Sequence, residues 1–126
     1  MIRILSGILA ICLLMVGCSE TEHDTRLKEI AEIVSDSPQE ALLSLDSIDC
    51  QTLSESDRHY YDLLTIKAKD KAYIDHTSDS LILDVISYYE NNSPRSLYAE
   101  ALYYGGRVYS DMGDAPTGQR TYHDFV

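Results

Sequence analysis

Apolar residues recur in this chain at the spacing of an amphipathic helix, in several separate stretches. The first stretch has them at positions i, i+3, i+4 and i+7, namely Leu27, Ile30, Ala31 and Val34. The same kind of pattern predicts helices over residues 25–35, 38–48, 55–71, 80–90 and 94–112. Runs of alternating β-branched residues and Asn-Gly or Asp-Gly hairpin turns are missing from the sequence. The sequence therefore predicts an all-α fold.

The breaks between the expected helices are short. Ser37-Pro38 suits the first turn of the second helix, and the spacing of Ser54 and Asp57 is that of a capping box for the third. Short breaks favour antiparallel neighbours, so we expect helix pairs that repeat at a period of about 34 to 45 residues, which indicates a solenoid. The helix over 55–71 has apolar residues on a wide face, and we expect neighbours to cover it on two sides.

The first 17 residues differ from the rest and are interpreted as a signal segment. Arg3 gives a positive start, and the stretch from Ile4 to Val16 is almost wholly apolar. That stretch is shorter than the roughly 20 residues that a membrane span needs. A polar run from Ser19 to Asp24 follows and is typical of a tether. The expected organisation is a signal segment over 1–17, a tether over 18–24 and a helical repeat domain over 25–126.

The end of the signal segment, Leu14-Met15-Val16-Gly17-Cys18, resembles a bacterial lipobox. The resemblance implies cleavage before Cys18 and attachment of lipid to its thiol, so that the chain is held at a membrane. Met15 stands where leucine is usual. The alternative is a plain signal peptide or an uncleaved anchor. Ser19 after the cysteine resembles the residue that permits transport to the outer membrane.

Residues 94–126 resemble a unit of the tetratricopeptide repeat (TPR) family. The matching positions are Leu102, Gly106, Tyr109, Gly113, Asp114 and Tyr122. The resemblance implies a right-handed solenoid of about three helix pairs that binds protein or peptide partners. Gly105 stands where the family has leucine and Gly118 where it has alanine, so we expect the last repeat to be incomplete. Earlier pairs match more loosely.

No arrangement of residues in the sequence points to catalysis, a cofactor or a metal. The four histidines are scattered and are interpreted as surface or linker residues: His23, His59, His76 and His123. After cleavage and lipidation Cys50 is the one cysteine left, which excludes an internal disulfide. The formal net charge of −11 repels phosphate backbones, so nucleic acid is not an expected partner.

Tyrosine is enriched, with ten copies against one phenylalanine and no tryptophan. Adjacent tyrosines on a helix point about 100° apart, so the two members of a pair cannot both point into the same core. One interpretation is that tyrosines fill the space between helices. The other is a partner-binding surface formed by Tyr61, Tyr89, Tyr104 and Arg107, since tyrosine and arginine suit such surfaces.

The sequence as a whole favours a non-catalytic interaction scaffold, anchored by lipid in the bacterial cell envelope and sorted to the outer membrane. The alternative is the envelope-side sensory region of a larger membrane-bound TPR regulator, of which this chain is a fragment. The apolar end Phe125-Val126 is consistent with a chain that continues or with an end that pairs with another chain. An enzyme or a glycan-binding protein would need a pocket with convergent polar groups.

Overall fold

The computed structural model describes residues 23–114 and 117, and in this part of the chain all regular structure is helical. The all-α prediction is confirmed for these residues. The elements are α2 (Thr25–Ile33), α3 (Pro38–Asp46), the short 3-10 helix η1 (Cys50–Thr52), α4 (Glu55–Lys71), α5 (Ser80–Asn91) and α6 (Arg95–Asp111). Each of these α-helices falls within about two residues of its predicted bounds. The 3-10 helix was not predicted.

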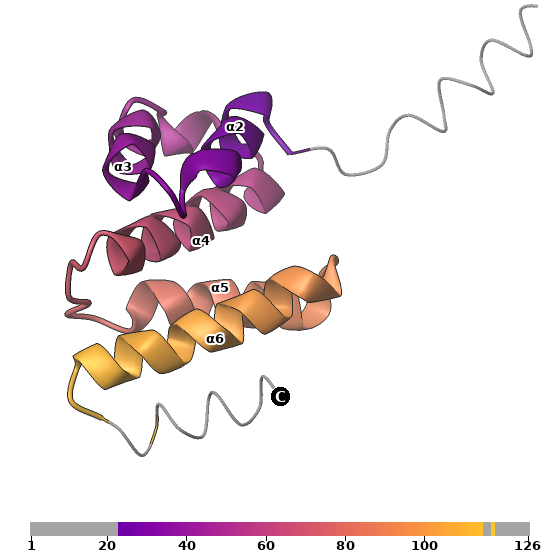
Figure 1. Cartoon of the computed structure of the whole chain (residues 1–126). Coiled ribbons are helices and arrows are strands. Elements are labelled where there is room, and N and C mark those ends of the chain that lie inside the picture. The colour runs from indigo at the N-terminus through magenta and orange to yellow at the C-terminus, as the bar shows by residue number, and fades with distance from the viewer. Residues whose placement is uncertain (1–22, 115–116, 118–126) are drawn as a thin grey trace, which may run out of the picture.

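Helix α4 lies at the centre of the molecule. It contacts α2, α3 and η1 on one side and α5 and α6 on the other, whereas α2 and α3 make no contact with α5 or α6. Helices α4, α5 and α6 run in alternating directions, so that the C-terminal ends of α4 and α6 lie on the same side (Figure 1). The predicted antiparallel packing and the coverage of α4 on two sides are both confirmed here.

The apolar interior consists of two clusters that meet on α4. The first joins α2 and α3 to one face of α4, and its buried members are Leu27, Ile30, Val34, Ala41, Leu45, Ile48, Leu64 and Ala68. The second joins the opposite face of α4 to α5 and α6, and its buried members are Leu63, Ile66, Ile82, Val85, Tyr89, Ala101, Tyr104 and Val108. The apolar stripe of each predicted helix therefore packs against a neighbouring helix.

Helix α4 begins with a side-chain cap and ends in a Schellman motif. The hydroxyl oxygen of Ser54 accepts a hydrogen bond from the Asp57 N–H at 3.2 Å, as the capping-box spacing predicts. At the other end, Tyr73 has a φ of 60° and its N–H donates to the Asp70 carbonyl at 3.1 Å. The next N–H, that of Ile74, donates to the Lys69 carbonyl at 2.9 Å, which completes the motif.

Helix α6 ends in the same motif, with glycine at the left-handed position. Gly113 has a φ of 80°, and its N–H donates to the Ser110 carbonyl at 3.1 Å. The Asp114 N–H donates to the Tyr109 carbonyl at 2.8 Å. The prediction that Gly113 closes this helix is confirmed. The sequence also predicts a sixth helix after Asp114, which would complete the third pair, and its residues lie outside the described part apart from Thr117.

The signal segment over 1–17 and most of the tether also lie outside the described residues. Within residues 23–114, no helix combines the length and the apolar character that a membrane span requires.

Candidate functional site

The tyrosine surface expected from the sequence does not form as predicted. Tyr89 and Tyr104 are 1% and 3% exposed and belong to the cluster between α4, α5 and α6. Burial raises the pKa of both phenol groups well above the usual value of 10.0. These two side chains are therefore core residues, and their assignment to an accessible partner-binding surface is wrong. The alternative interpretation, in which tyrosines fill the space between helices, describes them correctly.

Tyr61 is half-buried and ties α4 to α3. Its hydroxyl donates to the Leu45 carbonyl at 3.1 Å, and its ring packs against the first cluster. Burial raises the pKa of Tyr61, with smaller contributions from nearby acidic groups. Tyr61 also lines a surface hollow beside α3. A structural role accounts for its contacts.

Arg107 is the predicted surface residue that the structure leaves accessible, with 39% of its side chain exposed. Its Nε donates to Asp70 Oδ1 at 3.0 Å, so the side chain crosses from α6 to α4. It lines a surface hollow of about 330 Å³ together with Asp70, Lys71, Tyr73 and Tyr103. Tyr103 is the exposed neighbour of buried Tyr104, and the two rings meet edge to face.

The positions that resemble the TPR family fall in two groups. Leu102 and Gly106 are buried on α6, and the Tyr109 hydroxyl donates to Asp79 Oδ2 at 3.0 Å. Burial, and then this hydrogen bond, raise the pKa of Tyr109. Gly113 and Asp114 form the exposed turn after α6. Tyr122 and the lipidation candidate Cys18 lie outside the described residues.

Two of the histidines interpreted as surface or linker residues are buried. The interpretation is wrong for His59, which lies within α4, whereas His76 does lie in a linker but is buried there. The His59 ring on α4 stacks on Tyr88, and both ring nitrogens have partners: Nδ1 lies 2.7 Å from the Glu55 carbonyl and Nε2 lies 3.2 Å from Asp84. His76 lies in the loop between α4 and α5. Its Nε2 is buried and has no hydrogen-bond partner among the described residues.

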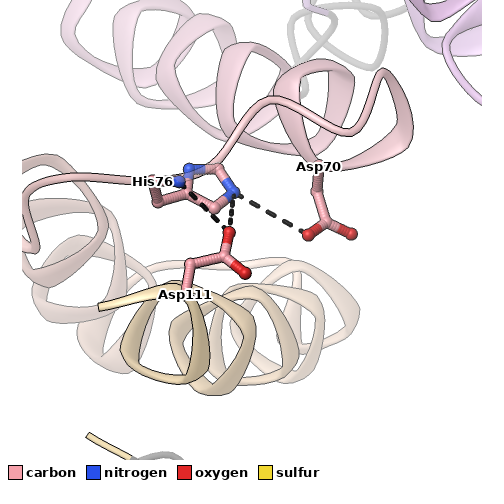
Figure 2. Close-up of side chains that lie close together, drawn as sticks. All are labelled: Asp70, His76 and Asp111. Carbon is pink, nitrogen blue, oxygen red and sulfur yellow. Dashed lines mark hydrogen bonds and ion pairs between the residues drawn. The ribbon is translucent and has the colours of Figure 1, made fainter. Parts of the chain in front are cut away.

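His76 points between two carboxylates, one from α4 and one from α6 (Figure 2). Its Nε2 lies 3.8 Å from Asp70 Oδ1 and 3.9 Å from Asp111 Oδ2. The loop is fixed there because the His76 N–H donates to the same Asp111 oxygen at 3.1 Å. The exposed fractions of the side chains are 6% for His76, 10% for Asp70 and 14% for Asp111. We call these three residues the Asp-His-Asp cluster.

Sequence analysis missed this cluster because its members are separated by 6 and 35 positions and match no ligand motif. One signal was present. Asp70 and Asp111 stand in the last turns of their helices, where the helix dipole disfavours a negative side chain. An acid at such a position is stabilised by a cation nearby. Comparisons of the chain with protein-family models, with curated proteins and with solved structures found no match.

Proposed function

We propose that this protein is a non-catalytic interaction scaffold of the TPR-like kind, anchored by lipid in the bacterial cell envelope, and that it binds a protein or peptide partner. The observation that carries the proposal is the order of helix contacts. Helix α4 touches both α2 and α6, whereas α3 and α5 do not touch each other. Two-helix repeats that stack on their neighbours produce this order, with the first helices of the pairs forming one continuous layer.

The proposed partner-binding surface lies on that layer, over the C-terminal halves of α4 and α6. Its exposed residues are Lys71, Tyr73, Tyr103 and Arg107, around the hollow described above. Tyrosine and arginine carry much of the binding energy at protein interfaces, because they bury a large area while keeping polar tips. Stacked repeats offer partners an extended surface of this kind.

Partner binding is tested with two matched variants of the full chain. Tyr103→Ala removes an exposed ring from the proposed surface, whereas Leu83→Ala removes an exposed apolar side chain from α5, outside it. We expect in vivo crosslinking to capture a partner with the native chain and with Leu83→Ala, and to lose it with Tyr103→Ala. Circular dichroism checks that both variants keep their helices. Equal capture by both variants would contradict the proposed surface.

Lipid anchoring is tested by metabolic labelling with a fatty acid. We expect the native chain and the control Cys50→Ala to incorporate label and to fractionate with membranes, and Cys18→Ala to do neither. Label retained by Cys18→Ala would contradict anchoring at that residue. The partner experiment and the labelling experiment have separate readouts, so either part of the proposal can fail alone.

A further inference from the structure

The Asp-His-Asp cluster holds a buried imidazole nitrogen that makes no hydrogen bond within the described part of the chain. A buried polar atom without a hydrogen-bond partner destabilises the folded state, so native structures seldom keep one without a reason. His59 gives the contrast within the same molecule, because both of its ring nitrogens have partners. His76 Nε2 instead points into the space between two carboxylates (Figure 2).

The electrostatics of this position favour a cation. Asp70 lies in the last turn of α4 and Asp111 is the last residue of α6, so both carboxylates stand at negative helix ends. The two helices end on the same side of the molecule (Figure 1). Two carboxylates that are 10% and 14% exposed therefore share a region where the peptide dipoles add to their negative charge.

Arg107 neutralises only part of that charge. Its Nε is 3.0 Å from Asp70 Oδ1, and a terminal guanidinium nitrogen is 3.8 Å from Asp111 Oδ1. One guanidinium faces two carboxylates, so it balances one of their two negative charges. Arg107 approaches from the exposed side, and the Asp111 oxygen nearest His76 is the other one, Oδ2. On Asp70, by contrast, Arg107 and His76 both face Oδ1, so an ion would share that oxygen with the guanidinium.

The donor set is one imidazole nitrogen and two carboxylate oxygens. Imidazole suits zinc and its neighbours in the first transition row, whereas magnesium and calcium prefer sites made of oxygen alone. We propose that Asp70, His76 and Asp111 bind a divalent first-row transition-metal ion, with Zn²⁺ the best match. This site does not depend on the lipid anchor, and it borders the partner surface proposed above, because Asp70 also lines the hollow there.

The geometry is close to what such an ion needs. The three ligand atoms all lie within 4.8 Å of one another. A tetrahedral Zn²⁺ bound at about 2.0–2.2 Å places its ligands about 3.4 Å apart. The two separations from His76 Nε2, 3.8 and 3.9 Å, are wider by about 0.4–0.5 Å, which small side-chain rotations close. Three protein ligands leave a fourth position for water or for a group from a partner.

The first test is a metal titration of the full chain in detergent, after treatment with a chelator. We expect one equivalent of Zn²⁺ to bind and to raise the melting temperature by several degrees, whereas Mg²⁺ at the same concentration does not. His76→Gln should weaken Zn²⁺ binding at least tenfold, and the control His59→Gln should leave it unchanged. Wild-type affinity in His76→Gln, or an equal response to Mg²⁺, would overturn the proposal.

A second variant keeps the proposal testable even where His76→Gln does not fold. Arg107→Gln removes the competing positive charge and keeps a neutral polar side chain. We expect it to melt at a lower temperature without metal and to bind Zn²⁺ at least several-fold more tightly. Co²⁺ in place of Zn²⁺ should give visible absorption bands that Asp111→Asn abolishes. Unchanged or weaker Zn²⁺ binding by Arg107→Gln, or identical Co²⁺ spectra in Asp111→Asn, would show that no ion binds between these carboxylates.

Discussion

Leu63 and Leu64 are consecutive residues of α4, yet they pack against different helices. Leu63 is 1% exposed and belongs to the cluster with α5 and α6, whereas Leu64 is 3% exposed and belongs to the cluster with α2 and α3. Successive side chains of a helix point about 100° apart, so a pair of leucines serves a helix with neighbours on both sides. Helix α4 is thus the element that joins the two halves of the apolar interior.

Truncating either leucine tests this joint. We expect Leu63→Ala and Leu64→Ala each to lower the free energy of unfolding by about 2–5 kcal/mol, because each leaves a cavity in a closed cluster. Urea unfolding should remain a single transition in both variants, since α4 belongs to both clusters. Two separate transitions in either variant would show that the halves unfold independently.

The helices and their packing faces were predictable from the sequence. Apolar spacing located all five α-helices of the described residues, and the wide apolar face of α4 indicated its two-sided burial. What spacing did not decide was the direction of each tyrosine. In the pairs Tyr88-Tyr89 and Tyr103-Tyr104, the second member is buried and the first is more exposed, and the rotation of each helix against its neighbours decides this.

The Asp-His-Asp cluster was beyond sequence reasoning for a different physical reason. His76 reaches Asp70 only because the chain reverses at Tyr73, which adopts a φ of 60°. Glycine or asparagine at that position would have predicted such a turn, but tyrosine does not. Asp111 comes from a helix that lies alongside α4 only after α5 has folded back. Such a cluster depends on loop conformation and on long-range packing, and local patterns encode neither.

Tyr73 occupies the position at the end of α4 that Gly113 occupies at the end of α6. Tyrosine is strained at a positive φ by roughly 1–2 kcal/mol, and 95% exposure means that its ring contributes little packing. We expect Tyr73→Gly to raise the free energy of unfolding by about 1 kcal/mol, after allowance for the greater flexibility of unfolded glycine. Thermal unfolding measures this, and Tyr73→Ala, which keeps the strain, should show no comparable gain.

The reverse change at Gly113 is the matched control. A Cβ atom placed there meets nothing within 4 Å, so only the backbone conformation with φ of 80° opposes alanine. Gly113→Ala should therefore lower stability by about 1 kcal/mol. Equal effects of the same sign at both positions would contradict the assignment of a common helix-ending motif.

The hydroxyl groups of Tyr89 and Tyr109 differ in their hydrogen bonding. The Tyr89 hydroxyl is buried without a hydrogen-bond partner in the described part of the chain, whereas that of Tyr109 donates to Asp79 at 3.0 Å. We expect Tyr89→Phe to raise the free energy of unfolding by about 1 kcal/mol, and Tyr109→Phe to lower it by about the same amount. Urea unfolding of the two variants checks the opposite signs, and a loss of stability in Tyr89→Phe would show that its hydroxyl is satisfied.

Asp62 on α4 provides a test of pH dependence. Burial raises its pKa above the usual 3.8, and the repulsion of Asp84 adds to this, while Arg58 and His59 act in the other direction. Because the pKa is raised in the folded state, the charged carboxylate lowers the stability of the fold. This loss of stability is present above the folded-state pKa and disappears as the pH falls below 3.8. Asp62→Asn should therefore raise the stability near pH 7 by less than about 1 kcal/mol, because Asp62 is partly exposed. The gain should vanish in acid.

Glu90→Gln is the control for Asp62→Asn. It removes one exposed negative charge and so corrects for the general effect of lowering the net charge. A loss of stability in Asp62→Asn near pH 7 would mean that the attraction of Arg58 outweighs the cost of burial.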